Sequence, residues 1–253
     1  MILRQFLVSE TACASYLFGC LTHRKLAVVE PHAELVDRYL ETADEVGAPI
    51  VAVFETHVQA DHLSGLPELV ARTGATPYFP AEAGVEFAHV PLGDGEPVEL
   101  GNTLVRALAV PGHAPAHAAY VVADRRRGAD DPWLVFTGDS LLVGDVGRPD
   151  LHAQGNVTAG ELARLQFASM RRLLELPDDV VVYPGHYAGS VCGRALSGNP
   201  ISTIGFERRH NAALQHERED DFVGALLENA PPPPANQAEI VAANRRGAVA
   251  IRP

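Results

Sequence analysis

The spacing of apolar and polar residues predicts strands and helices in alternation along most of the chain. Short apolar runs between turn residues predict strands at 2–8, 15–19, 26–29, 50–54, 76–79, 97–100, 103–110, 118–122, 133–136 and 180–183. Apolar residues at helical spacing predict helices at 33–46, 64–73, 159–174, 203–210, 220–227 and 240–246. The pattern is therefore that of a protein built from both strands and helices.

Length and composition favour one globular domain over residues 1–253. A chain of 253 residues can bury a large core without disulfides or a structural metal. Its 47% hydrophobic and 21% charged residues are ordinary for such a domain. Four consecutive prolines at 231–234 predict a stiff polyproline segment, so we expect residues 231–253 to form a Pro-rich C-terminal extension.

Charge and cysteine content exclude several classes of function. A formal net charge of -12 argues against a general nucleic-acid binder. The longest uncharged stretch, 11–23, is too short to span a membrane, and we see no signal peptide at the start. The cysteines are too few for a disulfide framework. We expect a reduced, cytoplasmic protein, with Cys13 and Cys20 in the core and Cys192 as a packed, inert thiol.

Four loops, each directly after a predicted strand, carry residues of the kind that bind metals. They hold the segment 57–62, His113 after Pro-Gly, Asp139 after Gly, and His186 after Pro-Gly. Taken alone, each histidine is more often a hydrogen-bonded loop residue, and Asp61 is more often a helix cap. As a set at the carboxyl ends of strands, however, imidazoles and carboxylates are the donors that hold zinc, iron or manganese. The sequence therefore predicts a metal site.

The segment 56–62, Thr-His-Val-Gln-Ala-Asp-His, resembles the T-H-x-H-x-D-H signature of the metallo-β-lactamase superfamily. The later Pro-Gly-His, Gly-Asp and Pro-Gly-His elements match the remaining ligand motifs in order, so the resemblance covers residues 1 to about 210. It implies an α+β fold, a four-layered αββα sandwich with the metal site at one edge between the two sheets.

Gln59 stands where the signature has its second histidine. In two-metal members such as glyoxalase II, that histidine binds the first metal. Residues matching Asp61, His62 and His186 bind the second metal, with the position of Asp139 as a bridge. An amide is a poor ligand for a borderline metal. The chain resembles the persulfide dioxygenase branch better, since its mononuclear iron is held by residues matching His57, His113 and Asp139.

Two further stretches resemble forms of that dioxygenase that are fused to rhodanese domains. One is Gly-Arg-Pro-Asp at 147–150, and the other runs from 188–193 into 202–205. The chain up to residue 253 leaves no room for a rhodanese module. We therefore expect a free-standing dioxygenase or a rhodanese on a separate chain.

The resemblance implies one Fe(II) per chain, held by His57, His113 and Asp139. The expected reaction oxidises glutathione persulfide, or a similar small persulfide, with dioxygen to sulfite and thiol. The remaining loop residues either orient these ligands through hydrogen bonds or form a second metal site. This outer group consists of Gln59, Asp61, His62 and His186.

Three residues are candidates for contact with the substrate. The planar fork of Arg148 suits a carboxylate, and a structural pair with Asp145 or Asp150 is an equal alternative. Tyr187 and Arg194 lie just beyond His186 and either line the thiol pocket or only pack and face solvent.

Two other functions remain open. One is a glyoxalase II-like hydrolase that splits hydroxyacylglutathione thioesters with one or two zinc ions. The other is a metal-stabilised protein that binds a persulfide without turning it over. A homodimer is one form in which such a fold is expected to occur.

Overall fold

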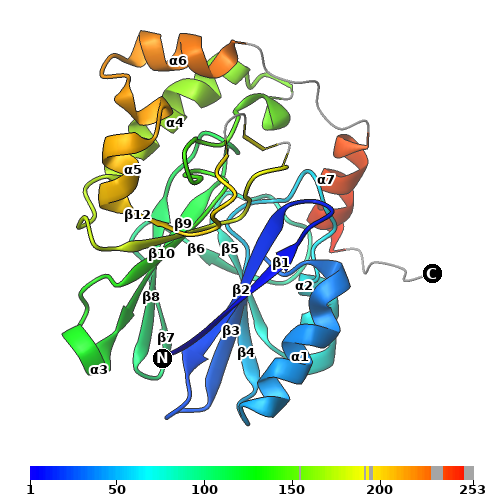
Figure 1. Ribbon diagram of the computed structural model, residues 1–253. Coiled ribbons are helices and arrows are strands. Elements are labelled where there is room, and N and C mark those ends of the chain that lie inside the picture. Colours follow the sequence, from blue (N-terminus) through cyan, green and yellow to red (C-terminus); the bar gives the residue numbers. More distant parts are fainter. Residues whose placement is uncertain (154, 191, 194–195, 229–235, 248–253) are drawn as a thin grey trace.

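Two six-stranded sheets form the centre of the computed structural model (Figure 1). The structure describes residues 1–153, 155–190, 192–193, 196–228 and 236–247. The strand orders are β1-β2-β3-β4-β5-β6 in one sheet and β12-β11-β10-β9-β8-β7 in the other. Each sheet therefore comes from its own continuous part of the chain.

The first sheet begins with antiparallel hairpins and continues with parallel strands. β1 pairs antiparallel with β2, and β2 with β3, whereas the later neighbours pair in parallel. Two helices, α1 (Val36–Glu45) and α2 (Leu66–Thr73), make the crossovers from β3 to β4 and from β4 to β5, and they pack their buried residues against the outer face. The strands are β1 (Ile2–Val8), β2 (Cys13–Cys20), β3 (Lys25–Val29), β4 (Ile50–Phe54), β5 (Thr76–Pro80) and β6 (Val90–Leu92).

The second sheet is antiparallel except for the β10–β11 pair. Its outer face is covered by α4 and α6, which pack on each other as well as on the strands. The strands are β7 (Pro97–Leu100), β8 (Thr103–Ala109), β9 (Ala118–Asp124), β10 (Leu134–Gly138), β11 (Val181–Pro184) and β12 (Ser202–Thr203). The helices of this half are α3 (Arg125–Gly128), α4 (Ala159–Leu173), α5 (Ile204–His210) and α6 (Glu219–Leu227), with short 3₁₀ turns at Asp150–His152 and Ala213–Gln215.

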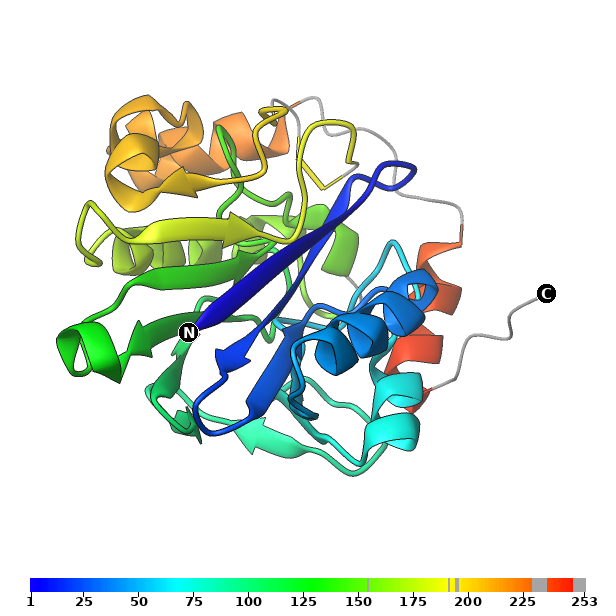
Figure 2. The ribbon, with the colours of Figure 1, turned by 60° about the horizontal axis from the view of Figure 1, so that its bottom comes forward.

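An aromatic core fills the space between the sheets. Tyr16 and Phe18 of β2 lie within 4.9 and 5.0 Å of Phe136 of β10, measured between ring centroids. Phe54 of β4 lies 5.0 Å from Tyr120 of β9. Helices outside both sheets complete the four layers (Figure 2). The αββα sandwich implied by the sequence is therefore confirmed.

The helix α7 (Gln237–Arg246) returns to the side of the first sheet and lies near α2 (Figure 1). Val241 joins the core beneath α1 and α2, and Ile240 and Asn244 are buried as well. Part of the expected C-terminal extension is thus packed helix. The four prolines lie outside the described residues.

Most predicted elements are present with ends shifted by one or two residues. The pattern missed β6 and β12, because strands of three and two residues are too short to show a period. It also missed α3 at 125–128, which begins with the Asp124 side chain accepting from the Arg126 amide.

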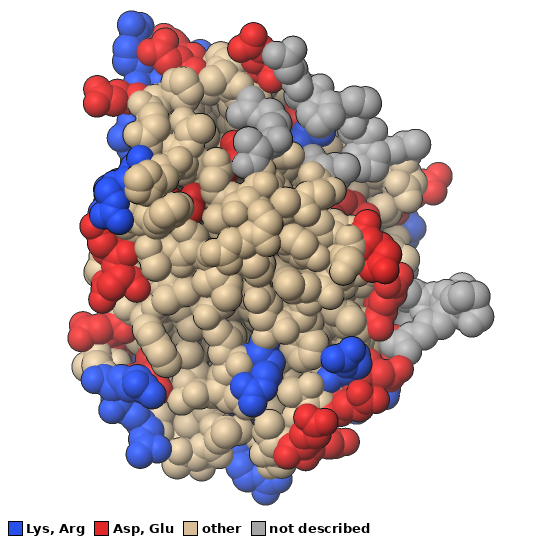
Figure 3. All heavy atoms as spheres, viewed as in Figure 1, with Lys and Arg blue, Asp and Glu red and all other residues tan. Residues whose placement is uncertain are grey.

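None of the helices in the described part of the chain is long and apolar enough to cross a bilayer. On the face seen in Figure 3, the charged side chains gather around the rim, and the middle is largely uncharged.

Candidate metal centre

The predicted loops come together where strands of the two sheets end. The loop after β4 carries His57, the loop between β8 and β9 carries His113, and Asp139 directly follows β10. The sheets approach closely here, since a Cβ on Gly138 would lie 2.2 Å from Thr56 Oγ1. Gly138 also has φ +49°, so a residue without a side chain is required at this point.

His113 and Asp139 face each other with free coordinating atoms. His113 Nδ1 donates to the backbone oxygen of Arg148 at 2.9 Å, which leaves Nε2 unprotonated and 3.5 Å from Asp139 Oδ2. That Oδ2 is buried and has no hydrogen-bond partner among the described residues. A buried carboxylate oxygen without a partner is costly, so the pair fits a site completed by a cation.

A chain of hydrogen bonds sets the tautomer of His57. Thr56 Oγ1 donates its only hydrogen to Glu30 and therefore accepts from His57 Nδ1 at 2.9 Å. His57 Nε2 is then left as the coordinating atom. The ring centroids of His57 and His113 lie 5.0 Å apart, with the rings at 88°. Burial lowers the pKa of both imidazoles, so they stay neutral and able to bind a metal.

A third histidine, His152, joins this pair and was not predicted. It lies in the 3₁₀ turn after Asp150, and one nitrogen from each of His57, His113 and His152 lies within 4.8 Å of the others. The available sequence signal was its position two residues after the matched Gly-Arg-Pro-Asp stretch.

His117 supports the pair in another way. Its ring stacks on that of His57 at 4.8 Å and 16°, and its Nε2 accepts from the backbone amide of Asp139. It therefore helps to hold two predicted ligands, His57 and Asp139, in position.

Asp61, His62 and His186 form a second cluster together with Cys13. His186 Nε2 lies 2.8 Å from Asp61 Oδ2 and 3.3 Å from Cys13 Sγ, while its Nδ1 contacts Asp139 Oδ1 at 2.6 Å. His62 Nδ1 contacts Asp61 Oδ1 at 3.1 Å. Cys13 is buried in the core, as expected, and its thiol also enters this cluster, because the first residue of β2 is bridged to His186.

The cluster also sets the charge of its members. Burial opposes ionisation of the Cys13 thiol, but the His186 and His62 imidazoles outweigh it and lower its pKa to about 7. Burial likewise opposes protonation of His186, yet Asp139 and the neighbouring acids raise its pKa well above the usual value. The ring of His186 lies between the carboxylates of Asp61 and Asp139.

Gln59 lies in neither cluster. Its Nε2 donates to Glu30 Oε1 at 3.0 Å and approaches Glu55 Oε2 at 3.5 Å. Burial raises the pKa of Glu30 to about 8, with Asp139 adding to the effect, and raises that of Glu55 to about 7. The amide thus belongs to a buried network of acids beneath the site.

Two of the three predicted substrate residues, Arg148 and Tyr187, are described by the structure, and each contacts other parts of the chain. Arg148 is buried and its guanidinium pairs with Asp150, with Nε 2.7 Å from Oδ1. Tyr187 is half-buried and packs against the core between the sheets. Arg194 lies outside the described residues.

Cys192 is buried, as expected for a packed thiol, and burial raises its pKa. Its position beside the site was not foreseen, since its Sγ lies within 4.8 Å of coordinating atoms of His113 and Asp139.

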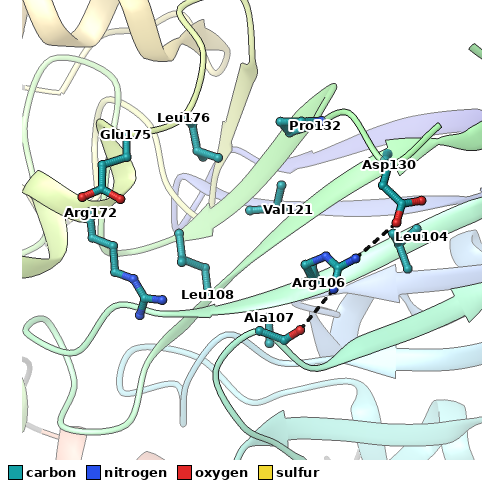
Figure 4. Close-up of a pocket in the computed structure, with 12 residues that line it drawn as sticks. Leu104, Arg106, Ala107, Leu108, Val121, Asp130, Pro132, Arg172, Glu175 and Leu176 are labelled. Carbon is teal, nitrogen blue, oxygen red and sulfur yellow. Dashed lines mark hydrogen bonds and ion pairs between the residues drawn. The ribbon is translucent and has the colours of Figure 1, made fainter. Parts of the chain in front are cut away.

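A separate hollow of about 460 Å³ lies on the outer face of β8 and β9 (Figure 4). Its lining includes Leu104, Leu108 and Val121 with paired charges at the edge, such as Arg106 with Asp130 at 3.3 Å. It contains none of the candidate ligands.

Comparisons with known proteins show which sequences and structures this chain is similar to. The persulfide dioxygenase ETHE1 of Mus musculus mitochondria is 26% identical over 254 residues, covering 100% of this chain and 91% of that protein. The hydroxyacylglutathione hydrolase of Methylobacterium nodulans is 30% identical over 224 residues, covering 87% and 80%. The crystal structure of ETHE1 from Myxococcus xanthus superimposes with a TM-score of 0.83 at 32% identity, covering 97% of this chain and 98% of that one. The sequence model described as metallo-beta-lactamase superfamily matches residues 29–186, and this chain belongs to that superfamily.

Proposed function

We propose that the protein is a mononuclear non-haem iron persulfide dioxygenase, with His57, His113 and Asp139 as its iron ligands. The observation that carries the proposal is the direction of Gln59. Its Nε2 is committed to Glu30 and Glu55, and its Oε1 has no hydrogen-bond partner among the described residues, so the signature segment offers the first site a single imidazole, that of His57. Two histidines and one carboxylate are the ligand set of many iron oxygenases that keep open positions for substrate and dioxygen. The likeness to both ETHE1 proteins supports the same choice.

Ferrous iron would supply open coordination positions and a redox-active centre between the persulfide sulfur and dioxygen. The chain's own residues hold that site in place. The backbone oxygen of Arg148 orients His113, and the Thr56–Glu30 pair orients His57. His186 fixes Oδ1 of Asp139 and leaves Oδ2 for the metal. In this role Asp61 and His62 orient His186 and do not bind the iron themselves.

The reaction consumes one persulfide, one dioxygen and one water. The terminal sulfur gives four electrons to dioxygen, and the bond between the two sulfurs breaks. The products are sulfite, the free thiol and two protons. Glutathione persulfide is the proposed substrate. Contacts from Arg148, Tyr187 and Arg194, a homodimer, a separate rhodanese partner and a cytoplasmic location remain predictions.

Oxygen consumption tests the proposal directly. Iron-reconstituted protein is given glutathione persulfide, and oxygen uptake, sulfite and metal content are measured on the same sample. Uptake with equimolar sulfite and one iron per chain is expected. Absence of uptake by iron-loaded protein would overturn the proposal.

A thioester hydrolase is the alternative, and the second cluster favours it. Cys13, Asp61, His62 and His186 together offer the sulfur, nitrogen and oxygen donors that zinc prefers. Hydrolysis of a hydroxyacylglutathione by zinc-loaded protein, without oxygen uptake, would support this alternative. A protein that only binds persulfide would show neither activity.

A further inference from the structure

The buried imidazole of His152 has no part in the function proposed above. We infer that His152 is a further protein ligand of the metal, beside His57, His113 and Asp139, and that it supplies the imidazole that position 59 lacks. The inference rests on the proposed metal site and extends its ligand set.

The first support is burial without a partner. His152 is 8% exposed, and its Nε2 has no hydrogen-bond partner among the described residues. Buried ring nitrogens are normally satisfied by protein or water, so an unpaired one requires an explanation. A metal ion between it and the neighbouring imidazoles would provide the missing partner.

The second support is convergence of the rings. The centroid of His152 lies 5.8 Å from that of His57 and 5.4 Å from that of His113, with interplanar angles of 78° and 73°. The three rings therefore meet edge to face, and their nitrogens lie within 4.8 Å of one another. An imidazole binds a metal ion that lies in the plane of its own ring. Ring planes that are steeply inclined to one another can therefore meet at a single metal position.

His117 provides the contrast within the same site. Its plane is nearly parallel to that of His57, at 16°, so the two planes cannot share a nearby point. Its Nε2 already accepts from the amide of Asp139, so the ring proton lies on Nδ1, which also has no partner among the described residues but cannot bind a metal while protonated. Of the two additional histidines, only His152 has the orientation of a ligand.

The third support is how His152 is held. The segment 148–152 both orients His113, through the backbone oxygen of Arg148, and carries His152 itself. The pair between Arg148 and Asp150 stiffens this segment from within. From outside, the side chain of Gln237 donates to the backbone oxygen of Leu151. A fixed backbone on both sides lowers the entropic cost of holding the ring at the metal.

The extra ligand has a consequence for metal choice. Four protein ligands fill the tetrahedral shell that zinc prefers and leave no position for substrate. A six-coordinate iron with the same ligands keeps two open positions, which suffice for a persulfide sulfur and dioxygen. With His152 as a ligand, the iron-loaded site would therefore keep room for the substrate, whereas a tetrahedral zinc site would not.

Counting imidazoles in the unaltered protein tests the inference without relying on turnover. The full chain is loaded with Fe(II) or, separately, Co(II), and coordinated imidazoles are counted by X-ray absorption. Three imidazoles are expected, whereas two would overturn the inference. Three imidazoles without oxygen uptake would support this inference and overturn the dioxygenase proposal. Two imidazoles with oxygen uptake would overturn this inference and support the dioxygenase proposal.

Variants provide the second test. We expect His152→Gln and His152→Leu to lower Co(II) affinity by more than the ~10–100-fold typical of a residue behind the ligands, and to reduce the count to two imidazoles. His89→Gln, which changes a histidine bonded to the Phe87 backbone outside the site, is the matched control and should bind Co(II) as the unaltered protein does. Metal-free unfolding curves check that each variant is folded. Unchanged Co(II) affinity and spectrum in folded His152→Gln would overturn the inference.

Discussion

At the scale of single residues, the site is defined by which atom of each side chain is already occupied. Nδ1 of His113 and Nδ1 of His57 are both committed to protein partners, so their Nε2 atoms are the ones available. Oδ1 of Asp139 is committed to His186, and its Oδ2 is left. The free Nε2 of His113 lies 3.5 Å from the free Oδ2 of Asp139, and one nitrogen of His57 lies within 4.8 Å of one of His113.

Removal of one side chain that carries such a coordinating atom should prevent metal binding. For His113→Ala we expect iron content to fall from one per chain to a small fraction, and oxygen uptake to be largely abolished. Metal analysis after dialysis against chelator measures the loss, with His89→Ala as the control. Normal iron content and activity in His113→Ala would contradict the assignment of this ligand.

Glu55 should make stability depend on pH. Burial raises its pKa from the ordinary 4.5 to about 7, so the folded state keeps its proton where the unfolded chain has lost it. Stability from this group is complete below about pH 4.5 and is lost as pH rises to about 7, by up to ~1.4 kcal/mol per pH unit. We expect Glu55→Gln to remove this loss.

Urea unfolding of the metal-free proteins at about pH 5 and about pH 7.5 measures the difference. The fall in unfolding free energy between the two pH values should be smaller in Glu55→Gln. Equal falls in both proteins would show that Glu55 does not titrate in this way.

The sequence identified residues whose order follows a known motif, and it missed those brought in by distant chain segments. Asp139 and His186, among the former, do meet at the site, although whether His57, His113 and Asp139 bind iron stays a prediction. Cys13 and His152 enter through strand pairing and a 3₁₀ turn that no local pattern encodes. Such contacts depend on the folded arrangement and not on neighbouring residues.

At the scale of elements, two helices support the metal loops from outside. Gln166 of α4 accepts from the backbone amide of His113 at 2.7 Å and donates to the backbone oxygen of Ser140 at 2.6 Å. Gly112 permits this contact, because a Cβ there would lie 2.1 Å from Gln166 Oε1. The position of α4 therefore fixes the His113 loop.

The start of α4 is stabilised by a reciprocal cap between Thr158 and Glu161. We expect Thr158→Ala to lower the free energy of unfolding by about 1 kcal/mol, because one amide at the helix start loses its acceptor. Thr158→Ser keeps the hydroxyl and should be close to the unaltered protein. Urea unfolding compares the three, and equal stability of Ala and Ser variants would show that the cap contributes nothing.

Asn244 of α7 holds the signature loop. Its Oδ1 accepts from the Ser64 amide at 3.0 Å, and its Nδ2 donates to the backbone oxygens of Gln59 and His62 at 3.0 and 2.9 Å. We expect Asn244→Ala to destabilise the protein by roughly 2–4 kcal/mol, since buried backbone groups lose their partners.

Thermal and urea unfolding measure the effect of Asn244→Ala, with Arg246→Ala on the exposed side of the same helix as the control. Both metal affinity and stability should fall in Asn244→Ala, and neither should fall in Arg246→Ala. Equal behaviour of the two variants would exclude this role of α7.

Elements were more predictable than contacts. Apolar periodicity located β1, β4 and β7 with the bounds that the structure has. It also located α7, but a period does not reveal which surface the helix covers. The sequence therefore placed α7 in an extension, although it is part of the first sheet's core.

At the scale of the whole molecule, the candidate ligands come from both sheets. The signature loop follows β4 of the first sheet, and the later ligands follow strands of the second. An ion bound here would link the two halves and bind the unfolded chain weakly. Iron at 100 times its dissociation constant should therefore stabilise the fold by about 2.7 kcal/mol.

Removal of the metal should correspondingly lower the midpoint of thermal unfolding. Differential scanning calorimetry of iron-loaded and chelator-treated protein under nitrogen measures the shift. His113→Ala should show the low midpoint in both conditions. A midpoint that does not respond to iron in the unaltered protein would contradict an ion link between the sheets.

The contacts of α7 bear on the timing of events during synthesis. A ribosome makes His57, His113 and Asp139 in that order, and it makes Asn244 only after all of them. Until that asparagine reaches the backbone of Gln59, His62 and Ser64, the loop that carries the first ligand lacks its anchor. Until then, the growing chain would bind the surrounding metal ions only weakly, whichever of them is most abundant. The metal would then be selected by the folded protein, in which the ligand positions are already fixed.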